Sequence, residues 1–96
     1  MPDILLQVFT QADTITDTVE EVVEVKNLVV YNDDVNTFDW VIDALIEICG
    51  HTEEQAEQLT LIIHYRGRAT VKEGSYETLL PMKTGLTDRG ISAAIE

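Results

Sequence analysis

The stretch that most constrains the fold is a junction at which a strand-like run gives way to a helix-like pattern. Residues Val22–Tyr31 are rich in valine and end in an aromatic residue, which is typical of a β-strand. The polar segment Asn32–Thr37 follows. The apolar residues after it recur at three- and four-residue spacing, which predicts a helix with a broad buried face: Phe38, Val41, Ile42, Leu45, Ile48 and Cys49. A loop between a strand and a helix lies on the surface, where functional side chains often stand on a rigid scaffold.

Capping residues divide the next part of the chain into two helices. The first is predicted to begin at Asn36 or Thr37, and Gly50 is predicted to end it in a left-handed conformation. Thr52 and Gln55 have the spacing of a capping box. A second helix is therefore predicted to begin there.

The last third of the chain predicts a strand, a helix and a strand. Residues Arg68–Glu73 alternate as a short strand does, and Tyr76–Asp88 has a helical pattern. Pro81 is costly inside a helix, so this helix is expected either to begin near Thr78 or to bend at the proline. Residues Ile91–Ile95 form the last predicted strand.

The predicted order of elements is β-α-α-β-α-β. It indicates an α+β two-layer domain in which three helices cover a three-stranded antiparallel sheet. With 96 residues the chain has room for one modest core. Residues 1–21 are acidic, have no basic residue and offer little apolar surface, so they are predicted to be a flexible acidic N-terminal extension ahead of a domain over 22–96.

The charge balance restricts the partners of this chain. It has 6 Lys and Arg against 18 Asp and Glu, a formal charge of −12, which repels nucleic-acid backbones and anionic membranes and favours a cationic partner. Cys49 is the only cysteine, so no disulfide forms within the chain, and a cytoplasmic location is predicted. A monomer is the default expectation for so small and acidic a domain.

Catalysis is the least favoured interpretation. Cys49 lies in a core pattern, and neither Ser75 nor Ser92 has the sequence context of an activated nucleophile. Asp33 and Asp34 are adjacent, and adjacent side chains usually point apart, so they make a poor acid–base pair. We therefore expect no enzymatic activity.

Metal binding is also weakly indicated. Asp34-Val35-Asn36 begins like a calcium-binding loop, but the glycine and the closing glutamate of that motif are missing. His51 and His64 have no cysteine partner for a zinc site. Neither a metal nor another cofactor is predicted.

Recognition of a cation fits the remaining polar residues better. Asn32, Asp33, Asp34 and His64 offer carboxylate and amide oxygens and, in a neutral ring, one imidazole nitrogen. A primary ammonium has three donors and needs such acceptors when it leaves water. Taken singly, the loop residues are more often part of a turn or helix cap, and a histidine at a helix end more often interacts with that terminus.

Four groups of residues between Lys26 and Gly67, with Ala69 just beyond, form a further pattern: Asn32-Asp33-Asp34, Phe38-Asp39-Trp40-Val41-Ile42 with Leu45, Ala56-Glu57-Gln58-Leu59, and His64-Tyr65-x-Gly67 with Ala69. In these residues the segment resembles ClpS, the adaptor that brings N-degron substrates to a Clp-type AAA+ unfoldase. A weaker match continues from Glu77 to Ile91, and the β-α-α-β-α-β order agrees with that family.

The resemblance implies a role for each matching position in the polar part of the site. Asn32, Asp34 and His64 would hold the α-ammonium of the substrate, and Asp33 would assist directly or through water. Glu77 matches an acidic residue on the face that docks the unfoldase. The N-terminal extension would help to hand over the substrate.

The resemblance also implies a hydrophobic pocket for the first side chain. Val41 and Ile63 would line it, and Ile91 stands where the family usually has leucine. At the entrance, Asn36-Thr37 replaces the usual Thr-Pro and Phe38 the usual gating methionine. Thr60 replaces a further pocket-lining methionine. These changes leave the order of preference among Leu, Phe, Tyr and Trp open.

The function implied is that of an adaptor for a ClpA- or ClpC-like unfoldase of the ClpP protease, with substrates that begin in Leu, Phe, Tyr or Trp. The alternative is a protein-interaction module like the C-terminal domain of the ribosomal stalk protein, which has a similar compact fold and no amine site. Convergence of Asn32, Asp34 and His64 would distinguish the two, because a module that only docks helices does not need three acceptors at one point.

Overall fold

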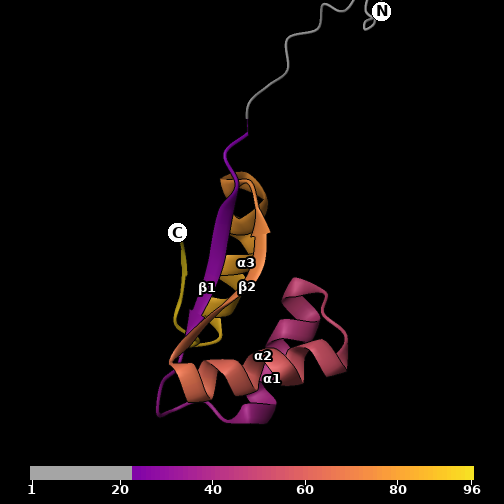
Figure 1. Ribbon diagram of the computed structural model, residues 1–96, viewed down its shortest axis with the longest axis vertical. Helices are drawn as coiled ribbons and strands as arrows, with labels where there is room; N and C mark the ends of the chain where they lie inside the picture. The colour runs from indigo at the N-terminus through magenta and orange to yellow at the C-terminus, as the bar shows by residue number, and fades with distance from the viewer. Residues whose placement is uncertain (1–22) are drawn as a thin grey trace, which may run out of the picture.

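The computed structural model describes residues 23–96, so the extension predicted over 1–21 lies outside the described residues. The predicted order β-α-α-β-α-β and the α+β fold class are confirmed (Figure 1). The elements are β1 (Lys26–Tyr31), α1 (Phe38–Cys49), α2 (Glu53–Arg66), β2 (Arg68–Gly74), α3 (Tyr76–Asp88) and β3 (Ala93–Ile95).

The sheet has the strand order β2-β1-β3, and both pairs are antiparallel. The central strand β1 begins at Lys26 rather than at the predicted Val22. The reason is the lengths of its partners: β2 ends at Gly74, opposite Lys26, and β3 ends at Ile95, opposite Leu28. The valines just before β1 that the structure describes are exposed. Their β propensity does not lengthen β1, because no neighbouring strand within residues 23–96 is there to pair with them.

The last strand is shorter than the predicted Ile91–Ile95. The backbone N–H of Ile91 donates to the carbonyl oxygen of Leu86 at 3.1 Å, which places Ile91 in the turn after α3. Its side chain is only 2% exposed. A buried residue in a connection has the same sequence pattern as the first residue of a strand, which explains the misplaced boundary.

The predicted caps are present at the ends of α1 and α2. The Thr37 side chain accepts from the N–H of Trp40, and Gly50 ends α1 with φ 75°. Thr52 and Gln55 form the reciprocal capping box of α2. These hydrogen bonds satisfy backbone groups that a helix terminus otherwise leaves unpaired.

The third helix accommodates its proline without a late start. It begins at Tyr76, after the N-cap Ser75, and continues to Asp88 with Pro81 inside it. The expected start near Thr78 is therefore wrong, because Ser75 accepts from the N–H of Thr78 and so begins the helix earlier.

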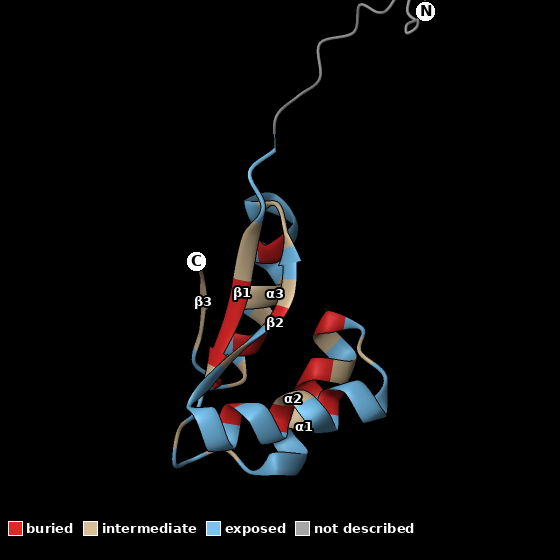
Figure 2. Ribbon diagram, in the orientation of Figure 1, coloured by how far each residue is buried: buried red, intermediate tan, exposed pale blue. Residues whose placement is uncertain are grey.

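The helices form two groups around the sheet. The ribbon shows α3 running along the sheet, while α1 and α2 lie at the end where β1 finishes and β2 begins (Figure 1). Figure 2 shows buried positions on β1, on β2 and on all three helices. Within residues 23–96, no helix combines the length and apolar character needed to cross a membrane. The core cluster consists of Leu28, Val30, Ala44, Leu45, Cys49, Ala56, Ile63, Val71, Leu79, Leu86 and Ile91.

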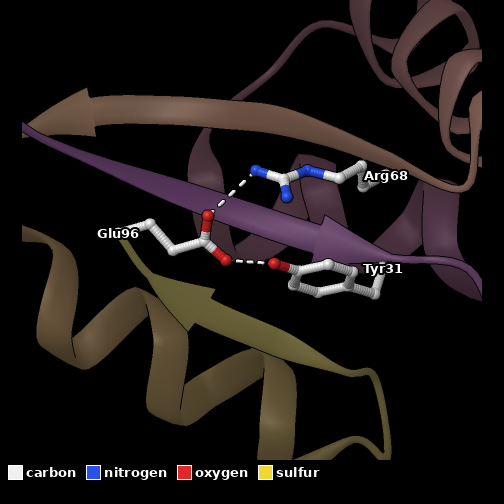
Figure 3. A network of polar contacts seen from close by, with 3 residues as sticks. All are labelled: Tyr31, Arg68 and Glu96. Carbon is white, nitrogen blue, oxygen red and sulfur yellow. Dashed lines mark hydrogen bonds and ion pairs between the residues drawn. The ribbon is translucent and has the colours of Figure 1, made fainter.

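A polar network joins residues at the two edges of the sheet to the central strand (Figure 3). Glu96, just after β3, accepts hydrogen bonds from the Tyr31 hydroxyl of β1 and from Arg68 of β2, the latter at 2.9 Å. The Tyr31 hydrogen bond, ahead of the Arg68 charge, holds the pKa of the Glu96 carboxyl below its ordinary value. The Arg68 guanidinium also lies 5.2 Å from the centre of the Tyr31 ring.

Candidate functional site

The loop between β1 and α1 is shaped by Asp33. One of its carboxylate oxygens accepts from the backbone N–H groups of Val35 and Asn36, both at 2.8 Å. The other accepts from Nδ2 of Asn36 at 2.8 Å. The backbone N–H of Asn36 is the main reason that the pKa of the Asp33 carboxyl lies below its ordinary value. Asp33 therefore stabilises the conformation of the loop through hydrogen bonds within it.

The same loop is tied to the connection between α3 and β3. Nδ2 of Asn36 also donates to the carbonyl oxygen of Gly90 at 2.9 Å, so both of its amide hydrogens have acceptors. One residue earlier in that connection, the carbonyl oxygen of Arg89 accepts from Nε1 of Trp40 at 3.0 Å. The Arg89 guanidinium in turn contacts Glu47 of α1 at 2.8 Å. The start of α1 is thus fixed by contacts with two adjacent residues, Arg89 and Gly90, at the beginning of this connection.

The sheet register brings α2 to the loop. Tyr31, the last residue of β1, pairs with Arg68, the first residue of β2. The next residue, Asn32, donates its N–H to the carbonyl oxygen of Gly67 at 2.9 Å. Gly67 ends α2 in a left-handed conformation with φ 90°. His64 lies less than one turn before Gly67, so continuation of the strand pairing brings the two segments together.

The His64 ring has aromatic neighbours on two sides. Its centre lies 5.0 Å from that of Phe38 in an edge-to-face arrangement, and 4.9 Å from that of Tyr65. Such contacts restrict how an exposed ring can turn. Phe38, which was expected to act as a gate, is thus also a support for His64.

These segments enclose a cavity of about 300 Å³ beside the loop. Its polar side is formed by exposed or half-buried residues of the loop and by His64. Its most buried lining residues are Thr60 and Ile63 of α2, which are 3% and 4% exposed. The lining residues are Asn32, Asp33, Asp34, Asn36, Thr37, Phe38, Val41, Thr60, Ile63 and His64.

The residues that line the cavity include every residue predicted for the amine site and its pocket except Ile91, and Glu77 does not line it. Ile91 belongs to the core cluster and is not among the residues that line the cavity. Its backbone is held in the turn after α3 by the hydrogen bond from its N–H to the carbonyl oxygen of Leu86, and its role in the pocket stays a prediction. Glu77 is exposed in the first turn of α3.

The residues that line the cavity determine which groups of a ligand it favours. It includes the carboxylates of Asp33 and Asp34 and no lysine or arginine, so it favours a cation. Its buried residues are largely hydrocarbon, so an apolar group is favoured beside that cation. Within residues 23–96 there is no cluster of three or more His, Cys, Asp or Glu that could hold a metal ion.

Sequence reasoning missed the residues that hold the site in place. The backbone carbonyl oxygens of Arg89 and Gly90 accept hydrogen bonds from the indole N–H of Trp40 and from Nδ2 of Asn36. Because the acceptors are backbone groups, these contacts leave no mark in the residue pattern. One signal was available: Trp40 lies outside the three- and four-residue spacing of the buried face of α1. A tryptophan there is expected to find an acceptor for its indole N–H.

Comparison with known proteins identifies the family. Residues 24–92 match the family model described as "ATP-dependent Clp protease adaptor protein ClpS". The ATP-dependent Clp protease adapter protein ClpS of Synechocystis sp. is 39% identical over 66 residues, which is 68% of this chain and 67% of that protein. The solved structure of Agrobacterium tumefaciens ClpS2 bound to L-phenylalaninamide has the same fold, with a TM-score of 0.64 and 15% identity, over 75% of this chain and 94% of that one. The chain therefore belongs to the ClpS family of adaptor proteins of the ATP-dependent Clp protease.

Proposed function

We propose that this chain binds the free α-amino group and the bulky apolar first side chain of N-degron substrates, and delivers them to a ClpA- or ClpC-type unfoldase for degradation by ClpP. The proposal rests on one cavity, in which hydrogen-bond acceptors from two separate segments of the chain lie beside an apolar recess. The chain itself has no catalytic role in the proposal. The family match favours this adaptor function over the module that resembles the ribosomal stalk protein.

The polar side of the cavity suits an α-ammonium group. Its three N–H donors would pair with the amide oxygen of Asn32, the carboxylate of Asp34 and a ring nitrogen of neutral His64. Asp33 adds negative charge beside them, although its oxygens already accept hydrogen bonds from the loop. An internal peptide segment has no ammonium and would leave these acceptors without donors, so it would be rejected.

The apolar recess suits the first side chain. Val41, Thr60 and Ile63 would surround it, with Phe38 at the entrance. Burying a large apolar side chain there contributes roughly 1.5–3 kcal/mol. L-phenylalaninamide, the ligand of the ClpS2 structure, has both features that the cavity would recognise: a free α-amine and an aromatic first side chain.

The experiment that tests this function compares free and blocked peptide ends. Fluorescence anisotropy is measured with labelled peptides that begin in Leu, Phe, Tyr or Trp, each beside its N-acetylated form. We expect binding of the free forms and none of the acetylated forms, because acetylation removes the charge and two of the donors. Equal binding of the two forms would reject amine recognition, and absence of binding by all eight peptides would reject the substrate class.

We further propose that Glu77 contributes to the surface that docks the unfoldase. It is exposed at the start of α3 and follows Tyr76 in the sequence. Tyr76 lines a groove between α3 and β3 together with Leu80, Lys83, Ala93, Ala94 and Ile95. We expect Glu77→Ala to keep peptide affinity unchanged while slowing ClpP-dependent degradation of an N-degron reporter. Glu73→Ala, which removes another exposed acid, is the control. Equal degradation by the Glu77 variant and the control would contradict this assignment.

A further inference from the structure

The recess contains one polar residue that the apolar character of the substrate does not require. Thr60 is 3% exposed and is the only buried polar residue among residues 23–96. It lines the cavity together with Ile63, which lies three positions later on the same face of α2. A buried hydroxyl needs hydrogen-bond partners, so its partners determine which groups the recess tolerates.

The hydroxyl proton of Thr60 already takes part in a hydrogen bond within α2. Oγ1 of Thr60 donates to the carbonyl oxygen of Ala56, one turn earlier in α2, at 2.7 Å. A hydroxyl has one donor and two acceptor lone pairs, so Oγ1 has only acceptor capacity left. Val41 and Ile63 add hydrocarbon alone, and both amide hydrogens of Asn36 are bound to Asp33 and Gly90. The buried part of the cavity can accept a hydrogen bond, but its side chains have no free donor.

We infer that Thr60 makes the recess selective for aromatic first residues that carry a hydrogen-bond donor, with tyrosine favoured over phenylalanine. This inference rests on the proposed function and names a preference within its substrate class. The tyrosine hydroxyl would donate to Oγ1 of Thr60 and so replace the hydrogen bond that it loses with water. Phenylalanine fills the same recess and leaves the lone pairs of Oγ1 unused.

The test uses two peptides that differ by one oxygen, one beginning in Tyr and one in Phe, with the same following residues. With the unaltered protein we expect the Tyr peptide to bind more tightly. Thr60→Val keeps the shape of the side chain and removes the hydroxyl. We expect it to weaken the Tyr peptide about 10-fold, because the buried phenol loses its acceptor, and to change the Phe peptide by less than about 2-fold.

Two controls separate loss of the hydroxyl from loss of structure. Thr60→Ser restores the hydroxyl and is expected to restore the preference for Tyr. Denaturant unfolding of each variant measures its fold independently of binding. Tighter binding of the Phe peptide by the unaltered protein, or an unchanged Tyr-to-Phe ratio in Thr60→Val, would overturn the inference.

The N-acetylated Tyr peptide distinguishes failure of this inference from failure of the proposed function. If acetylation abolishes binding while the Tyr-to-Phe ratio does not respond to residue 60, only the role of Thr60 is wrong. If acetylated and free Tyr peptides bind equally, amine recognition fails and the inference about Thr60 falls with it.

Discussion

Asp34→Asn should weaken binding of a peptide with a free N-terminal phenylalanine by at least about 30-fold, equivalent to about 2 kcal/mol. Asp34 lines the cavity from the β1–α1 loop. The ammonium group of the peptide loses hydration when it binds, and the negative charge of the Asp34 carboxylate would offset that desolvation cost. An amide of the same size is neutral and cannot do so. The measurement is anisotropy with one labelled peptide and both proteins at the same ionic strength.

A charge-matched variant is needed because the whole chain is acidic. Asp43→Asn changes the formal charge in the same way, from −12 to −11 by removal of one carboxylate, at an exposed position on α1 that does not line the cavity. We expect this variant to bind within about 2-fold of the original protein, since exposed charges at a distance are screened by salt. Similar losses in both variants would indicate general attraction between an acidic protein and a cationic peptide.

Gly67→Val is expected to reduce both stability and peptide binding. With φ at 90°, Gly67 has a backbone conformation that β-branched residues rarely adopt, and forcing one into it costs about 1–3 kcal/mol. Apart from the neighbouring residues in the chain, nothing lies within 4 Å of a Cβ added here, so this atom meets no clash and the expected cost comes from the backbone conformation. If the backbone relaxes instead, we expect the hydrogen bond between the N–H of Asn32 and the carbonyl oxygen of Gly67 to break. The loop would then move away from His64. Denaturant unfolding and anisotropy measure the two effects.

Gly67→Asn is the matched control. Asparagine tolerates the left-handed conformation better than other residues with a side chain, so we expect a smaller loss of stability and nearly unchanged binding. A Val variant as stable as the Asn variant would show that the left-handed cap is not needed. If the Val variant loses stability but keeps full affinity for the peptide, the Gly67–Asn32 contact does not position the site.

Much of the fold could be predicted because local residues determine the ends of the helices. Thr37, Gly50 and the pair Thr52 and Gln55 cap the helices as their chemistry predicts. The strand limits could not be predicted in this way. They depend on where the partner strands end, and Ile91 shows that a buried residue next to a strand need not belong to it.

The candidate site was predicted from the residues and from the ClpS resemblance, but the means of its assembly was not. Two segments some thirty residues apart meet because Tyr31 pairs with Arg68, and this register is a property of the whole sheet. Asp33 shows a second limit. Its sequence position indicated an acceptor for a ligand, whereas the structure shows its oxygens bonded within the loop. The use of an acceptor depends on which donors the fold brings near it.

The most direct test of the central claim is to locate the ligand by NMR and to block its amine in the same experiment. ¹⁵N-labelled protein is titrated with L-phenylalaninamide and, separately, with N-acetyl-L-phenylalaninamide. We predict that the free amine shifts signals of the β1–α1 loop and of Thr60–His64, including the His64 ring, and that the acetylated compound leaves them unchanged. Amine recognition in this cavity would be contradicted if both compounds shifted the same signals, or if the free amine shifted only residues of α3 and β3.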